Sequence, residues 1–483
     1  MTPPTRLARI IGPWTAGAIL VGCVIGTGVF KKASAVAGQL PEPGLALSVW
    51  IVVGLLTLFG ALALAEVAAL IPESGGNLIF LHKAYGPIFG FLWAWVEFWF
   101  LRCASIAALA VIFSESLNDV LRLLSQHEGD VLTFWPRQIT SVLLVLGLGV
   151  LSALGTKQGA RFQVIVTAVK VASIVMIALL PLLAWLLPLG GETAPNPANF
   201  RPFWPSNWGT VSLAAYATAM VAVLWPYNGW TNIAPLAGEI RDPQKNVPRA
   251  FVGGLVLLIT VYLAVNVSYY LAVPAAEMTG LGTTPVSTEV CRRLAGPAGL
   301  LLASAALMLS VFGSVGGNLL VGPRSVFALS RQKLAPAWLG AIHPRYGTPF
   351  RAALFMMFVT AGLILAVALY TQTTTGADGR ALKSSFDLLT DFVVFGATLL
   401  ETLAVATVYV FRKKPPYATM ERRYRCPGYP VVPAVYILAM LGVLGNMLLT
   451  AESRTTALVG LGLIALGVVA YRWVRPAHSA AES

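Results

Sequence analysis

Two short motifs interrupt apolar segments that are long enough to cross a membrane. They are Gly22–Gly28, which reads GCVIGTG, and Trp225–Trp230, which reads WPYNGW. A helix in lipid must satisfy its own backbone N–H and C=O groups, because no water is there to bond them. A break in such a helix frees those groups to bind a solute, and paired breaks in the two halves of a chain are typical of the binding site of a secondary transporter.

The first break offers hydrogen-bond donors and acceptors side by side. Gly26, Thr27 and Gly28 begin an outer half-helix, whose free N–H groups and dipole favour an anion such as a carboxylate. Val24 and Ile25 end the inner half-helix, and their unpaired carbonyl groups suit an ammonium group. The motif therefore predicts a site for a molecule that carries both groups.

The second break repeats this pattern. Pro226 and Gly229 interrupt the helix, and carbonyl groups near Trp225 and Asn228 become available. Together the two breaks predict recognition of the carboxylate and ammonium groups of an α-amino acid.

Two ionisable residues lie deep within apolar segments. Lys170 stands about a dozen positions into segment 160–187, which places it ~15 Å deep at ~1.5 Å per residue. Glu401 precedes Arg412 by about ten residues in segment 385–411 and also lies at membrane depth. Intramembrane charges are functional hypotheses by default, so Glu401 is a candidate proton site. The alternative for Glu401 is an interhelical hydrogen bond without a coupling role.

Glu97 and Arg102 are two further charged residues, and both lie in the expected span 82–118. They are five positions apart, a spacing at which two side chains do not share an α-helical face well. We interpret them as a packing network and not as substrate contacts.

The composition identifies an all-α polytopic membrane protein. The chain is 57% hydrophobic and only 11% charged, less than half the charged fraction usual in soluble proteins. The net charge of +13 is explained by positively charged loops on one side of a membrane, and nucleic-acid binding is not expected. The 4 Cys and 4 His residues show no ligand spacing, so neither a metal site nor a cofactor is expected, and no nucleophile–base pair indicates an enzyme.

We expect 12 transmembrane helices with both termini cytoplasmic, because most Lys and Arg residues then lie inside. The expected spans are 13–37, 44–71, 82–118, 138–155, 160–187, 209–237, 249–273, 297–330, 351–371, 385–411, 431–450 and 456–474. The first and sixth spans each open a unit of five helices. This placement predicts two inverted repeats, 1–200 and 201–414, followed by two accessory helices and a tail in 415–483.

The order and spacing of the motifs resemble the amino acid–polyamine–organocation superfamily, and within it the L-type amino-acid transporters and their bacterial relatives. The segments that carry the resemblance are Gly22–Phe30, Ile71–Gly76, Tyr85–Pro87, Trp225–Trp230, Gly238–Arg249, Phe312–Asn318, Ile342–Pro344 and Arg425–Pro430.

The resemblance implies a leucine-transporter-type fold and alternating access to a central site. It implies that the substrate carboxylate binds the backbone of Gly26, Thr27 and Gly28, and that Trp225 is the gate. The full set of expected substrate-binding residues is Val24, Ile25, Gly26, Thr27, Gly28, Trp225, Asn228 and Thr231.

The resemblance also gives Lys170 a role. In the family, a lysine at this position takes the place of a sodium ion and bridges the first, fifth and eighth helices. Ser314, in the eighth, is its expected partner. The alternative is a structural strut.

The leading hypothesis is a sodium-independent exchanger or facilitator of L-amino acids, with neutral or small substrates favoured. A proton-coupled symporter, using Lys170 or Glu401, is the alternative, and cationic amino acids or polyamines are alternative substrates. Segment 119–137 has no cysteine, so no disulfide-linked heavy chain is expected. These features favour a stand-alone protein of a prokaryotic plasma (inner) membrane.

Overall fold

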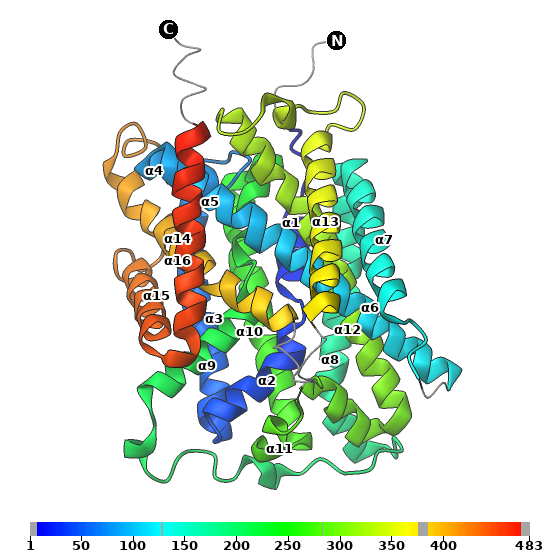
Figure 1. The fold of residues 1–483 in the computed structure, drawn as a ribbon. Coiled ribbons are helices and arrows are strands. Elements are labelled where there is room, and N and C mark those ends of the chain that lie inside the picture. The colour runs from blue at the N-terminus through cyan, green and yellow to red at the C-terminus, as the bar shows by residue number, and fades with distance from the viewer. Residues whose placement is uncertain (1–6, 127–128, 283, 375–384, 475–483) are drawn as a thin grey trace.

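The computed structural model describes residues 7–126, 129–282, 284–374 and 385–474, and this part of the chain is helical. Its β-structure is a single isolated bridge between Ile11 and Ile240. Most helices run between the two ends of the molecule, and both termini lie at the same end, the top of Figure 1. The expected class, an all-α polytopic membrane protein, is confirmed.

Ten helices in the described residues are long and apolar enough to cross a membrane. These spans comprise α3 (Pro43–Leu70), α5 (Pro87–Val96) with η1 (Glu97–Ala104) and α6 (Ser105–Ser125), α7 (Phe134–Ala153), α8 (Thr156–Leu186), α10 (Pro243–Ala272), α12 (Val286–Arg331), α13 (Phe350–Thr374), α14 (Ser385–Lys413), α15 (Val431–Leu449) and α16 (Ala451–Val474).

The two remaining expected spans are the broken ones. α1 (Pro13–Val24) and α2 (Gly28–Gln39) meet at a bend of 48° and together form an eleventh span. The expected segment 209–237 is α9 (Leu213–Tyr227) followed by the 3-10 helix η4 (Trp230–Glu239), and α9 alone is too short to count as a span. The short helices α4 (Asn77–Tyr85) and α11 (Ala275–Thr279) lie outside these spans.

The expected start of the eighth span at residue 297 matches a break in α12. Ala295 and Gly296 have non-helical backbone angles, and Gly296 has a φ of 56°, which favours glycine. The part of α12 that crosses the membrane therefore begins after this bend.

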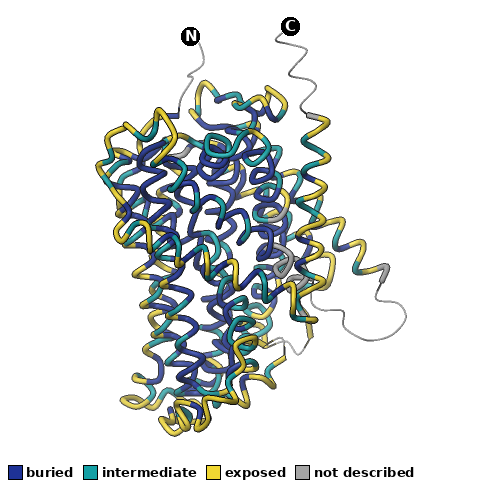
Figure 2. Tube along the Cα trace, turned by 90° about the vertical axis from the view of Figure 1, so that its left-hand side faces the viewer, coloured by how far each residue is buried: buried dark blue, intermediate teal, exposed yellow. Residues whose placement is uncertain are grey.

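The broken helix α1 lies at the centre of the bundle, where it packs against α8, α10 and α12. Figure 2 shows buried residues concentrated along the interior of the molecule. In contrast, α16 is mostly exposed at the edge of the bundle. The bundle thus buries the breaks within the protein. In a membrane, irregular backbone is tolerated only where it is buried in protein or lines a cavity.

Candidate functional site

The break in α1 comes where the sequence motif predicts it. Ile25 leaves the helix with extended backbone angles, φ −67° and ψ 100°, and α2 restarts at Gly28 with Thr27 as its N-cap. The first N–H groups of α2 have no carbonyl one turn earlier to bond, as at every helix start. These donors face the region where α1 and α9 both end, so an anion there would meet several of them.

The second break turns on Gly229. Its φ of 93° lies in the left-handed region, which glycine adopts without strain, and η4 begins at the next residue. On the helical side, the hydroxyl of Tyr262 donates to the carbonyl of Pro226 at 3.0 Å. The N–H of Asn228 donates to the carbonyl of Trp225 at 3.0 Å, which closes the last turn of α9.

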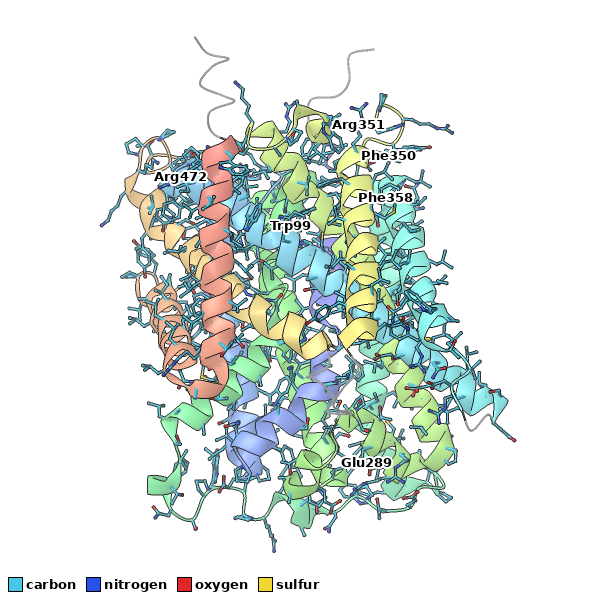
Figure 3. All side chains as sticks on the ribbon, in the orientation of Figure 1. Trp99, Glu289, Phe350, Arg351, Phe358 and Arg472 are labelled. Carbon is cyan, nitrogen blue, oxygen red and sulfur yellow. The ribbon has the colours of Figure 1, made fainter. Side chains whose placement is uncertain are left out.

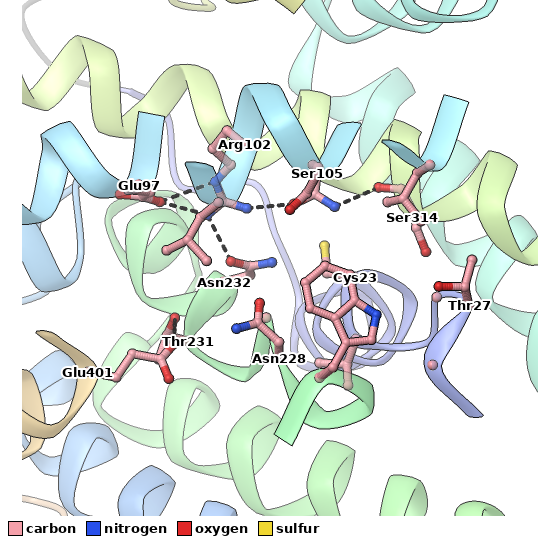
Figure 4. Close-up of a pocket in the computed structure, with 18 of the residues that line it drawn as sticks. Cys23, Thr27, Glu97, Arg102, Ser105, Asn228, Thr231, Asn232, Ser314 and Glu401 are labelled. Atoms are coloured by element: carbon pink, nitrogen blue, oxygen red, sulfur yellow. Dashed lines mark hydrogen bonds and ion pairs between the residues drawn. The ribbon is translucent and has the colours of Figure 1, made fainter. Parts of the chain in front are cut away.

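A cavity of about 50 Å³ lies between the two breaks (Figure 4). Nine of the residues singled out from the sequence line it: Val24, Gly26, Thr27, Gly28, Trp225, Asn228, Thr231, Ser314 and Glu401. Ile25 and Lys170 do not line it. The structure therefore brings most of the predicted site together in one small space.

Lys170 lies behind the cavity. Its side chain is 0% exposed, and its ammonium donates to the carbonyls of Gly22 at 2.7 Å and Ile25 at 2.5 Å. The third bond goes to the hydroxyl of Ser314 at 2.8 Å. All three donors of the ammonium are therefore used, which compensates for burial of its charge.

The carbonyl of Ile25 is thus already occupied. It accepts from Lys170 and also from the Ser314 hydroxyl at 2.6 Å. A glycine in α12 lets the lysine pass, because a Cβ at Gly313 would come within 2.8 Å of the lysine Cε. The lysine thereby connects α8 to the end of α1 and to α12.

The expectation that Glu97 and Arg102 share no helical face is wrong. The eight residues of η1 form a π-helix, in which side chains five positions apart come to the same side. The guanidinium of Arg102 donates to the carboxylate of Glu97 at 2.7 Å, and both side chains are buried. The sequence signal for this π-helix is the spacing itself, since two opposite charges in an apolar span need each other.

Arg102 also reaches two asparagines that sequence reasoning did not select. Its guanidinium donates to the side-chain oxygens of Asn318 at 2.7 Å and Asn232 at 2.8 Å, as Figure 4 shows in part. All of these residues line the cavity. Both asparagines lie within apolar segments, where a polar amide needs a hydrogen-bond partner. This position in the sequence could have marked them as members of the site.

Glu401 differs from the other buried glutamates. Its carboxylate accepts from the Trp230 indole at 3.2 Å and the Thr231 hydroxyl at 3.4 Å, both neutral donors. Glu66, by contrast, accepts from Arg412 at 2.7 Å and lies outside the lining of the cavity.

The segment that precedes α1 pairs with the end of η4. The N–H of Ile11 donates to the carbonyl of Glu239 at 2.9 Å, and the N–H of Arg241 donates to the carbonyl of Ile11 at 2.9 Å. Arg324 and Glu239 form a fully buried ion pair at 2.8 Å. Among the described residues, no three His, Cys, Asp or Glu side chains lie close enough together to hold a metal ion.

Comparison with known proteins gives a match to the amino acid permease family over residues 11–464. The serine/threonine exchanger SteT of Bacillus subtilis (strain 168) is 30% identical over 470 residues, which cover 97% of each chain. The human large neutral amino acids transporter small subunit 2 is 30% identical over 377 residues, covering 76% of this chain and 66% of that protein. The human cystine/glutamate transporter is 26% identical over 453 residues, covering 94% and 82%.

Proposed function

We propose that this chain, which belongs to the amino acid permease family, exchanges small neutral L-amino acids without sodium. Membership of the family makes it an integral membrane protein of amino-acid transport and not an enzyme. The observation that carries this proposal is the Lys170 ammonium, held by three oxygen atoms at 2.5 to 2.8 Å. The lysine nitrogen occupies the space among these oxygens that a metal cation would need.

The two breaks support recognition of the α-amino acid backbone. The substrate carboxylate binds the N–H groups of Gly26, Thr27 and Gly28, and the substrate ammonium binds carbonyls at Val24 and around Trp225 and Asn228. All of these residues line one cavity. These backbone N–H and C=O groups bind both charged groups of a zwitterion, and no charged side chain is needed at either position.

The walls of the cavity favour a small, uncharged side chain. Its volume is about 50 Å³, and Trp93, Leu109 and Trp225 limit it. The charge of Arg102 is matched by Glu97, so the pair presents little net charge to a substrate. A substrate hydroxyl would find polar partners among Thr231, Asn232 and Asn318. The relative named as a serine/threonine exchanger agrees with this preference.

Transport follows by alternating access, with Trp225 closing the site at one side. The contacts of Ile11 with Glu239 and Arg241 then close the other side. We propose that the repeats are 1–200 and 201–414, with accessory helices in 415–483, in a prokaryotic plasma membrane with both termini cytoplasmic. No disulfide-linked heavy chain is part of the proposal.

Glu401 supports a second candidate, a proton-coupled symporter. Its carboxylate is buried, lines the cavity and accepts hydrogen bonds from two neutral donors. A carboxylate without a bonded cation can take up a proton at lower cost than one held by arginine.

The proposal is tested with purified protein in liposomes and a panel of radiolabelled amino acids in sodium-free medium. Uptake of alanine, serine and threonine is expected to require unlabelled amino acid inside, and phenylalanine, lysine and glutamate are expected to compete weakly. Accumulation into empty liposomes under an inward proton gradient would instead establish the symporter. Preferred uptake of large or cationic substrates would overturn the proposed size and charge selectivity.

A further inference from the structure

A second concave surface lies on the outside of the bundle, along α13. It encloses about 490 Å³ and is almost entirely apolar. The residues that line it are Trp338, Arg351, Leu354, Phe355, Phe358 and Val359. Phe358 is 63% exposed, although it belongs to a helix that is long and apolar enough to cross a membrane. The groove therefore opens toward the lipid.

The π-helix η1 borders this groove. Phe98 stacks on Phe355 with ring centroids 5.3 Å apart, and Trp338 packs edge-on against Phe355 at 6.0 Å. Trp99 packs against Phe98 at 5.0 Å and is 39% exposed. In Figure 3, Trp99 lies between α13 and α16, and Phe358 points from α13 on the same side of the molecule. The aromatic surface thus continues from α13 onto η1.

Arg351 is the only charged side chain that lines the groove. It lies in the first turn of α13, at the end of the molecule that carries both termini (Figure 3). Its side chain is exposed and makes no hydrogen bond or ion pair with the described residues, and that first turn holds no acidic residue. A cation beside the positive end of a helix dipole is unfavourable alone, and an anion placed there is stabilised by both.

We propose that this groove binds an anionic phospholipid, with the phosphate on Arg351 and an acyl chain along Phe355, Phe358 and Trp99. The groove is complementary to a phospholipid along its length: a cation lies at the level of the headgroup, and apolar and aromatic side chains lie at the depth of the acyl chains. The charge selects a lipid with net negative charge over a zwitterionic one. One arginine near the surface favours the anionic lipid by about fivefold.

The bound lipid would touch the outer side of the segment that shapes the transport site. η1 turns Phe98 onto Phe355 of the groove, with Trp99 beside Phe98, and it turns Glu97 and Arg102 toward the central cavity. On the basis of the proposed function, occupancy of the groove stabilises η1 and raises the exchange rate. Lipid binding itself does not depend on that function.

The test uses tryptophan fluorescence of the full chain in phosphatidylcholine vesicles. The probe is phosphatidylglycerol or phosphatidylcholine brominated on its acyl chains, which quenches tryptophans that it contacts. The difference between wild type and Trp99→Phe isolates the signal of Trp99. We expect brominated phosphatidylglycerol to reach half-maximal quenching of Trp99 at about one fifth of the lipid fraction that brominated phosphatidylcholine requires. This preference should be lost in Arg351→Gln.

Two controls make the result specific. Trp185→Phe isolates a tryptophan on α8 that is 50% exposed and does not line the groove, and both lipids should quench it equally. Lys413→Gln removes an exposed cation outside the groove and should leave the preference of Trp99 intact. Equal quenching of Trp99 by both lipids, or a preference that survives Arg351→Gln, overturns the lipid site.

Exchange is measured in the same vesicles and separates the two proposals. A lipid preference at Trp99 in a protein that exchanges no amino acid would overturn the proposed function alone. Exchange without a lipid preference would overturn the groove alone.

Discussion

The two broken helices expose the same kind of backbone groups, and the structure satisfies them in different ways. At the first break, the carbonyls of Gly22 and Ile25 accept from the ammonium of Lys170. At the second, the carbonyl of Pro226 accepts from the neutral hydroxyl of Tyr262. A protein cation therefore bonds the backbone carbonyls of the first break, and a neutral group bonds that of the second.

One fold can thus combine a more rigid and a more movable side of a site. Hydrogen bonds from an ionised donor are about twice as strong as neutral ones. At the first break, such bonds hold the backbone carbonyls to α8, and Ser314 extends them to α12. At the second break, the Pro226 carbonyl is held to α10 by a neutral bond, and Arg102 bonds the side chain of Asn232 in η4. We infer that the second break, which carries Trp225, moves more readily during transport.

The largest effect is expected from Lys170→Ala. It leaves the carbonyls of Gly22 and Ile25 without their shared donor, and we expect exchange to fall about a hundredfold or more. Initial exchange rates in liposomes measure this, with a gel-filtration profile to show that the protein stays folded. Lys157→Ala, an exposed lysine on the same helix, is the control and should exchange normally. A normal rate in Lys170→Ala would make this lysine a structural strut.

Gly28→Ala should have the next largest effect, because the two breaks touch there. A Cβ on Gly28 would lie 2.7 Å from Pro226 Cα, which is backbone of the second break. Overpacking of about 2 kcal/mol would reduce substrate affinity about thirtyfold.

Gly26→Ala is the matched control for this contact. Its Cβ would lie 3.7 Å from the nearest atom, the hydroxyl of Ser314, so affinity should change by less than about threefold. Equal affinities in the two variants would mean that contact between the breaks does not shape the site.

Ser314→Ala sharpens the comparison at the first break. It removes the third ligand of the Lys170 ammonium and one donor to Ile25, while both carbonyl contacts of the lysine stay in place. One hydrogen bond to a charged group corresponds to about a tenfold lower exchange rate. Ser310→Ala removes a neighbouring hydroxyl that bonds the Gly26 carbonyl and not the lysine, and should cost less. A larger loss in Ser310→Ala would contradict the central place of the ammonium.

Tyr262→Phe probes the second break and should be milder. It removes one neutral hydrogen bond to the carbonyl of Pro226, worth about 1 kcal/mol, or about fivefold in rate. If this variant lost as much activity as Lys170→Ala, the two breaks would be equally dependent on their partners and the contrast would fail.

Glu401→Gln should have the smallest effect. A glutamine oxygen can still accept from Trp230 or Thr231, so exchange in sodium-free medium should stay within about twofold of wild type. The same vesicles are then given a proton gradient. Accumulation that is driven by the gradient in wild type and lost in the variant would favour the proton-coupled symporter.

Local sequence predicted the positions of the breaks, because glycine and proline act on the backbone at their own positions. Gly28 begins α2 and Gly229 adopts a positive φ, as their motifs suggested. Lys170 could be placed at membrane depth by counting residues, and its partners lie on the helices that the family resemblance implied.

Other features depended on packing that a linear sequence does not display. The π-helix that joins Glu97 to Arg102 changes the helical period, so an α-helical face gave the wrong geometry. The amides of Asn232 and Asn318 meet the arginine only after three helices assemble. The occupied carbonyl of Ile25 could not be foreseen, because two adjacent carbonyls look alike in the sequence.

The most direct test of the account is the dependence of exchange on sodium. Liposomes loaded with unlabelled serine receive labelled serine in sodium chloride or in choline chloride at equal pH, and initial rates are compared. We predict equal rates in the two salts, because the Lys170 ammonium already lies among the oxygens at the first break. A rate that rises and saturates with sodium would contradict it.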